Sequence, residues 1–289
     1  MISRPARAID THVHVWDYDS PWMAWLVDRP ASWDVIRRDF RWSDLRAALD
    51  TADVDELILM QACTTPAETR MLLDVASGQP CVRGVVGWAT LTSPQATERD
   101  LTSFEGPGSN KLVGIRNNHQ WAPDQDVIAT PAAIESCRLL AERNLALDLH
   151  FPDYRTLPLA QKLAETVSEG RYIIDHLGKP AITDPEAFRP WAEAMSQLSM
   201  LPNVYIKYSG WATFLGRTKA SDVKPYIEFA LEKFGPGRIM FAGNWPVALV
   251  AGSYRDTYDA SLEAIAGLTA TELDRIFYDT AVNCYLRPR

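Results

Sequence analysis

The chain has 289 residues, a length typical of a single α/β barrel and sufficient to bury a large core without disulfide bonds. Hydrophobic residues make up 47% and charged residues 23%, so neither a disordered nor a fibrous protein is expected. The formal net charge of −8 argues against nucleic acid or an anionic membrane as a partner, because both are bound by basic surfaces.

The cysteines and the N-terminus indicate where the protein works. Cys63, Cys81, Cys137 and Cys284 form no CxxC pair, which favours buried thiols in a reducing compartment over disulfides or a zinc finger. The first residues have no apolar signal core, and no apolar run approaches the about 18 residues of a membrane span. We therefore expect a cytoplasmic protein.

Short apolar runs alternate with longer stretches suited to helices. Runs rich in Val and Ile and bounded by turn residues predict buried strands. They are Ala8–Val15, Glu56–Gln61, Val82–Trp88, Leu112–Asn117, Leu145–Phe151, Tyr172–His176, Val204–Ser209 and Arg238–Gly243. Helices are predicted at Ser43–Asp50, Thr65–Ala76, after Ser93, and at Pro131–Arg143, Leu157–Ser168, Pro185–Leu198, Val223–Phe234, Tyr254–Ala266 and Thr269–Ala281.

This alternation predicts one domain over residues 1–289, a (β/α)8 TIM-type barrel with an extra C-terminal helix across one end. A doubly wound open sheet is the alternative, but it prefers a Gly-rich turn after its first strand, and none is present here. Residues 17–41 are too long for a plain loop and predict an insertion over the barrel mouth. Their Trp22, Trp25 and Trp33 either shape a pocket or, as the default expectation, simply pack the loop.

Polar residues gather at the predicted C-terminal strand ends, where barrel enzymes place their active sites. In chain order these positions hold His12 and His14, Gln61, Trp88, Arg116, Asp148 and His150, Asp175 and His176, Lys207 and Ser209, and Asn244 and Trp245. His119 lies just beyond the fourth strand, so all five histidines of the chain lie at or just past a strand end. A scatter unrelated to function would rarely produce this pattern.

The spacing of His12 and His14 places both side chains on one face of a strand. Two imidazoles at a barrel mouth can bind a divalent metal, hold a carbonyl oxygen or move protons, or they can simply satisfy each other and the backbone. In the sixth strand, adjacent residues should face opposite sides. We expect His176 to face the lumen and Asp175 to act as a packing or orienting partner.

Two cations near the mouth are expensive to bury without a partner. Arg116 is the better candidate for binding substrate, because a guanidinium suits bidentate contacts. Lys207 either contacts substrate or pairs with Asp148 or Asp175. His150 is either lumenal or a satisfied core histidine.

Five stretches, IDTHVHVWD, LVGIRN, IDHLGKP, IKYSG and FAGNWPV, resemble in this order the signatures of the amidohydrolase-related lactonases. That group includes fuconolactonase-like, rhamnonolactonase-like and pyrone-dicarboxylate lactonase-like enzymes, and the similarity spans nearly the whole chain. The resemblance implies a barrel that hydrolyses a cyclic ester, with His12, His14 and His176 around the scissile carbonyl and Arg116 on the substrate. It also implies either no metal requirement or a weakly bound divalent metal such as zinc, held through His12 and His14.

The sequence departs from the family pattern after the eighth strand. Relatives have a water-activating aspartate in a segment like GSDWP, whereas this chain has Asn244. An amide has no proton-accepting state near neutral pH, so Asn244 cannot be a general base. The chain is then an inactivated variant, a natural variant with another base, or a non-hydrolytic relative.

The sequence therefore predicts a hydrolase that opens a small sugar lactone or carboxylated lactone in carbohydrate or aromatic catabolism. The predicted catalytic residues are His12, His14, His176 and Asn244. The predicted substrate-binding residues are Arg116, Lys207, His150, Gln61, Trp88 and Trp245. The alternatives are a metal-dependent decarboxylase or amide hydrolase, a catalytically impaired lactone-binding protein, and a lactone isomerase. The oligomeric state is not predicted.

Overall fold

The structure, a computed structural model, describes residues 3–118 and 125–287, so His119 lies outside the described residues. Eight strands form one parallel sheet in chain order. They are β1 (Ile9–Val13), β2 (Glu56–Met60), β3 (Val82–Gly87), β4 (Leu112–Asn118), β5 (Ala146–His150), β6 (Tyr172–Ile174), β7 (Val204–Tyr208) and β8 (Ile239–Phe241). The predicted strands are confirmed, and each observed strand begins or ends within two residues of its prediction.

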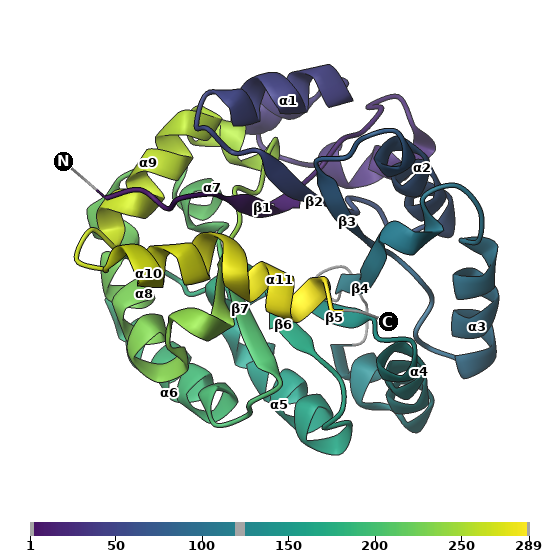
Figure 1. The fold of residues 1–289 in the computed structure, drawn as a ribbon. Coiled ribbons are helices and arrows are strands. Elements are labelled where there is room, and N and C mark those ends of the chain that lie inside the picture. The colour runs from purple at the N-terminus through teal and green to yellow at the C-terminus, as the bar shows by residue number, and fades with distance from the viewer. Residues whose placement is uncertain (1–2, 119–124, 288–289) are drawn as a thin grey trace.

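The sheet closes on itself between its first strand and the segment after its last. Val13 forms a parallel bridge with Trp245, and the His14 N–H donates to the Trp245 carbonyl oxygen at 2.7 Å. Figure 1 shows the resulting ring of strands with helices outside it. The predicted (β/α)8 barrel is confirmed. The C-terminal strand ends therefore meet at one mouth.

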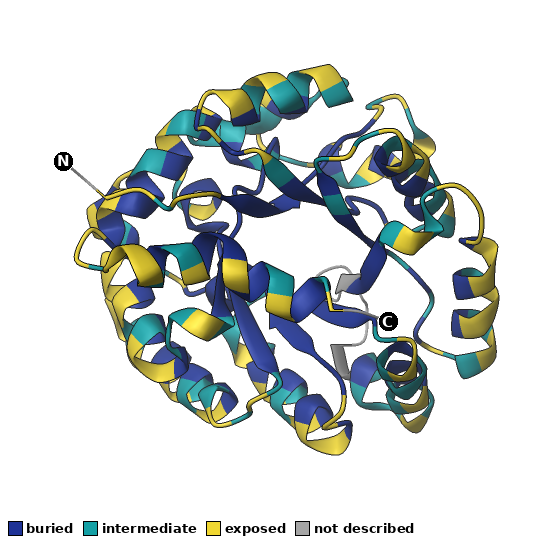
Figure 2. Cartoon of the chain, viewed as in Figure 1, coloured by how far each residue is buried: buried dark blue, intermediate teal, exposed yellow. Residues whose placement is uncertain are grey.

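Helices surround the barrel, and Figure 2 shows their buried faces turned toward the strands. Their bounds are α1 (Trp42–Asp50), α2 (Pro66–Ser77), α3 (Pro94–Ser103), α4 (Pro131–Glu142), α5 (Leu157–Thr166), α6 (Phe188–Ser199), α7 (Trp211–Leu215), α8 (Ala220–Phe234), α9 (Tyr254–Ala264), α10 (Ala270–Asp274) and α11 (Thr280–Tyr285). The insertion at 17–41 holds two 3-10 helices, η1 (Pro21–Leu26) and η2 (Ala31–Ile36). None of the helices in the described part of the chain has the length and apolar character that a membrane crossing requires.

The last helical segment lies across one end of the barrel, as predicted (Figure 1). It is not one continuous α-helix, because a π-helical turn at Arg275–Asp279 joins α10 to α11. Tyr278 and Tyr285 share a buried cluster with Ile9, Ile58 and Met240 from the strands. The segment therefore closes the end of the barrel opposite the mouth.

Charged side chains run through the barrel interior from this closing segment toward the mouth. The Tyr285 hydroxyl lies 2.8 and 2.7 Å from the two carboxylate oxygens of Asp148. The Lys207 ammonium also bonds to Asp148, and its Nζ is 3.5 Å from Asp175 Oδ1. Asp175 Oδ2 in turn lies 3.4 Å from Arg116 Nε. We call these five residues the charge column. Two carboxylates and two cations balance its charge, as burial in a barrel requires.

Removing the phenol that ends the charge column should weaken the fold. We expect Tyr285→Phe to lower the free energy of unfolding by about 1.5–3 kcal/mol, because the lost hydrogen bond ends on a buried carboxylate. The matched control is Tyr208→Phe, whose hydroxyl donates to a neutral carbonyl oxygen at 3.3 Å and is expected to contribute about 0.5–1.5 kcal/mol. Urea unfolding measures both. Equal losses would contradict the role assigned to Tyr285.

Candidate active site at the mouth of the barrel

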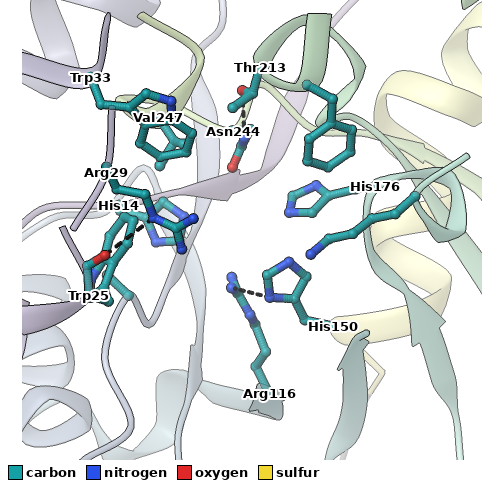
Figure 3. Close-up of a pocket in the computed structure, with 13 residues that line it drawn as sticks. His14, Trp25, Arg29, Trp33, Arg116, His150, His176, Thr213, Asn244 and Val247 are labelled. Carbon is teal, nitrogen blue, oxygen red and sulfur yellow. Dashed lines mark hydrogen bonds between the residues drawn. The ribbon is translucent and has the colours of Figure 1, made fainter. Parts of the chain in front are cut away.

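The mouth of the barrel holds a cavity of about 170 Å³. It is lined by His14, Trp25, Arg29, Trp33, Ala62, Arg116, His150, His176, Lys179, Thr213, Phe214, Asn244 and Val247. Figure 3 shows Arg116, His150, His176 and Asn244 pointing into one space, with Arg29 reaching in from the insertion. The structure thus brings together a large part of the predicted site. The remaining predicted residues lie outside the lining.

Those remaining residues have packing or supporting positions. The Trp245 ring packs edge-to-face on Phe40, with centroids 5.1 Å apart. The Gln61 amide lies behind Arg116 and donates to its carbonyl oxygen at 3.4 Å. Trp88 is half-buried outside the lining. His12 and Lys207 lie fully buried below the cavity, and Lys207 has the ion pairs that were its predicted alternative.

The end of β6 turns two adjacent side chains inward. Strand alternation predicts opposite faces for Asp175 and His176, and this prediction is wrong, because the strand ends at Ile174. His176 then has a φ of 56°, in the left-handed region. Gly210 packs against it so closely that a Cβ there would lie 2.6 Å from the His176 Cβ. A glycine at position 210 is therefore required to seat His176.

Arg116 fixes the protonation pattern of two imidazoles. A guanidinium only donates, so its Nη1 donates to His12 Nε2 at 3.0 Å and its Nη2 to His150 Nδ1 at 3.1 Å. The proton of neutral His150 is therefore on Nε2, and that of His12 is on Nδ1, which lies 3.5 Å from Asp175 Oδ1. Burial, with the nearby cations, lowers the pKa of both imidazoles well below the usual value. Both are neutral at physiological pH.

His14 has the opposite arrangement. Its Nδ1 lies 2.8 Å from the Met60 carbonyl oxygen, which can only accept, so Nδ1 carries the proton. The lone pair of the ring is therefore on Nε2. Burial and the Arg116 charge lower the pKa of His14 to about 3. His14 is thus a neutral proton acceptor in the cavity lining.

His176 and Asn244 complete the polar lining. His176 Nδ1 lies 2.8 Å from Ser209 Oγ, a hydroxyl that can donate or accept. Asn244 has a φ of 53°, a conformation that asparagine tolerates well. Its Nδ2 donates to Thr213 Oγ1 at 3.2 Å. This bond orients the amide of Asn244 and leaves its oxygen as an acceptor.

Asp10 ties the first strand to the segment that carries Asn244. Its carboxylate accepts from the N–H groups of His12 and Gly243, both at 2.9 Å, and from the Tyr254 hydroxyl at 2.8 Å. A Cβ on Gly243 would lie only 2.3 Å from Asp10 Oδ2. Burial raises the pKa of Asp10 to about 6, against the lowering effect of these bonds. Asp10 therefore aligns β1 with the segment after β8, where the barrel closes.

A metal ion has one candidate position among the described residues, and it differs from the predicted pair. His12, Asp175 and His176 offer ligand atoms within 4.8 Å of one another. Both Asp175 oxygens are buried without a hydrogen bond, and imidazole with carboxylate suits zinc. Yet Arg116 donates to His12, and Lys207 lies 3.5 Å from Asp175. These residues fit a divalent ion that is held weakly against two positive charges.

Sequence reasoning missed two cations and undervalued two aromatic residues in the lining. Lys179 stands in the IDHLGKP stretch, and Arg29 lies in the insertion between η1 and η2. Trp25 and Trp33 do shape the pocket, contrary to the default expectation of plain packing. The clustering of tryptophans in a long mouth insertion was the available signal. Nothing in the sequence pattern singled out Arg29.

Comparisons with known proteins give a consistent result. The amidohydrolase family model matches residues 9–287. An L-fucono-1,5-lactonase of Burkholderia multivorans is 32% identical, covering 98% of this chain and 97% of its own. An L-fucono-1,5-lactonase of Burkholderia ambifaria is 34% identical, covering 86% of this chain and 83% of its own. The crystal structure of a Burkholderia multivorans amidohydrolase with bound zinc has a TM-score of 0.89 at 29% identity and covers 98% of this chain and 100% of its own.

Proposed function

This chain belongs to the amidohydrolase family, as its sequence motifs predicted, and on that basis we propose that it hydrolyses a small lactone. The Burkholderia relatives named as L-fucono-1,5-lactonases support this proposal and favour a sugar-derived ring. Such a substrate agrees with a role in carbohydrate catabolism in the cytoplasm. The cavity of about 170 Å³ suits one small cyclic molecule.

One observation carries the proposal: a proton acceptor and a set of donors line the same cavity. His14 offers the lone pair of Nε2, while the Arg116 guanidinium and the Nε2–H of His150 are donors. Donors arranged in advance around a developing oxyanion stabilise acyl-transfer transition states. The arrangement therefore fits attack of water on a carbonyl.

In the proposed reaction, His14 accepts a proton in the first step and returns it in the second. Water attacks the lactone carbonyl carbon, and its proton passes to His14 Nε2. Arg116 and His150 hold the oxyanion. The bond from that carbon to the ring oxygen then breaks, and His14 returns its proton to that oxygen, which gives a hydroxy acid. The low pKa makes neutral His14 a weak base in the first step and protonated His14 a strong acid in the second.

Asn244 has a positioning part in this scheme. Its amide cannot take the proton, but its oxygen can accept a hydrogen bond from the attacking water. Thr213 fixes the amide in the orientation needed. The family aspartate is thus replaced by a group that holds water without activating it.

Removing divalent metals is expected to change the turnover of a lactone by less than about twofold. A divalent ion bound by His12, Asp175 and His176 would supply Lewis-acid polarisation of an oxygen. Arg116 and Lys207 already supply positive charge there, which opposes metal binding. Activity before and after dialysis against EDTA measures the effect. A loss of tenfold or more that zinc restores would contradict this prediction.

A pH-indicator assay on a panel of sugar and dicarboxylate lactones tests the function itself. We expect measurable ring opening of at least one lactone by the unmodified chain. The control is Arg116→Met, which removes the Nη1 and Nη2 donors of Arg116 and keeps an unbranched side chain. Equal rates with the variant, or no turnover of any lactone even with Asn244→Asp, would reject the proposal.

A further inference from the structure

The cavity lining is strongly unequal in charge. Arg29, Arg116 and Lys179 line it, and the lining residues within the described ranges include no aspartate or glutamate. The three cations come from different parts of the fold: the insertion, β4 and the turn after β6. Figure 3 shows Arg29 and Arg116 reaching into the cavity from different elements of the fold. The field in the cavity is therefore positive on more than one side.

Lys179 is held in place by its backbone. Its φ of 50° is in the left-handed region, which is uncommon for a residue with a side chain. Its N–H donates to the His176 carbonyl oxygen at 2.9 Å. The side chain is almost fully buried, and Nζ lies 5.8 Å from the centre of the Phe214 ring. A strained backbone that presents a buried ammonium to a cavity is typical of a ligand-binding position.

The surroundings of Lys179 are cationic. Its side chain is almost fully buried, and the charges of Arg116 and Arg29 repel its ammonium, against the attraction of Asp175 and Asp153. An anion in the cavity would offset both the burial and the repulsion between the cations. Asp175 already balances Arg116 in the charge column, so the charges of Arg29 and Lys179 are the ones that favour an anionic ligand over a neutral one.

Arg29 is oriented by the aromatic residues of the insertion. Its Nε donates to the Trp25 carbonyl oxygen at 3.3 Å. Its guanidinium carbon lies 5.9 Å from the Trp25 ring centre and 5.2 Å from that of Trp33. Both rings also line the cavity, so they limit the positions that Arg29 can take. A fixed guanidinium at the outer wall suits a carboxylate, which it can bind through two hydrogen bonds.

The polar residues of the cavity fall into two pairs with different roles. Arg116 and His150 form the inner wall and have the donors assigned to the lactone carbonyl. Arg29 and Lys179 have no part in that chemistry. We propose that Arg29 and Lys179 bind a carboxylate on the lactone, so that the substrate is an acidic lactone, such as the lactone of a sugar dicarboxylic acid. This inference rests on the proposed lactone hydrolysis and names its substrate class.

A matched pair of lactones tests the proposal. The two rings have the same stereochemistry, and one carries a carboxylate where the other carries a hydroxymethyl group. We expect the kcat/KM of the acidic lactone to exceed that of the neutral lactone by about tenfold or more, since hydrogen bonds to charged groups have this strength. A ratio near or below one would overturn the proposal.

The variants Arg29→Gln and Lys179→Gln should each lower this ratio by about tenfold, mainly through the KM of the acidic lactone. Arg29→Lys keeps the charge but loses the paired hydrogen bonds of the guanidinium, so it should lower the ratio less than Arg29→Gln does. Arg189→Gln removes an exposed cation outside the cavity lining and should leave the ratio unchanged. Unfolding midpoints identify any variant that has lost its fold. An unchanged ratio in both folded glutamine variants would overturn the proposal.

Binding of glutarate separates this inference from the proposed function. If neither lactone turns over, lactone hydrolysis is wrong. Calorimetric titration with glutarate then still tests the carboxylate site. Binding that weakens about tenfold in Arg29→Gln and Lys179→Gln would support the site. Absent binding, or binding that both variants retain, would reject it.

Discussion

Replacing His14 with asparagine is expected to lower kcat/KM for lactone hydrolysis by about 10²- to 10⁴-fold, the usual contribution of a general base. The asparagine amide can still donate to the Met60 carbonyl oxygen, as His14 Nδ1 does. Asparagine has no counterpart to the lone pair on Nε2 of His14. The change therefore separates the proposed chemical role of His14 from its structural one.

The pH dependence of this loss provides an independent readout. Because burial lowers the pKa of His14 to about 3, the ring is neutral and able to accept a proton at all higher pH values. The ratio of wild-type to variant rates should then be the same at about pH 5 and about pH 8. Activity within threefold of wild type in a folded His14→Asn protein would mean that another residue is the general base, and His176 would be the next candidate.

Replacing Asn244 with aspartate is expected to raise kcat for lactone hydrolysis by about 10²-fold. Aspartate also tolerates the left-handed backbone found at this position. The Thr213 hydroxyl can turn to donate to the new carboxylate, because its oxygen already lies 3.2 Å from the amide nitrogen. A negative charge there would accept a proton from water and would also raise the pKa of His14.

The control for this gain is Asn283→Asp, which adds the same charge at an exposed position on the closing segment. It should not change kcat. An unchanged rate in Asn244→Asp would mean that His14 already activates the water fully and that position 244 serves only to hold it. A lower rate would mean that the amide donor to Thr213 matters more than a second base.

Much of the fold was predictable because a parallel barrel buries its strands on both faces. Each apolar run therefore stands out between polar helices, and every strand was located. The ends were harder to predict. Nothing local marks Ile174 as the last residue of β6, so alternation misassigned Asp175, which in fact faces inward beside Arg116 and Lys207. The left-handed turn at His176 belongs to tertiary packing against Gly210.

The candidate site was predictable where its residues end strands and much less so elsewhere. His14, Arg116, His150, His176 and Asn244 were all found from that position, and all line the cavity. Arg29 depends on how a long insertion folds back over the mouth, which local patterns do not encode. Lys207 illustrates the opposite difficulty. Its position at a strand end is right, but the choice between substrate and ion pair depends on distances to Asp148 and Asp175.

The charge column has a consequence for synthesis. Tyr285, on α11, is translated after every other member, yet it holds the carboxylate of Asp148, on which Lys207 depends. Domains generally fold as units, and α11 is the last helix of this one to leave the ribosome. A nascent chain from which α11 has not yet emerged lacks the phenol that completes the charge column. We therefore expect full catalytic competence only after this closing segment leaves the ribosome, and we expect truncation before α11 to leave the interior charges open to water.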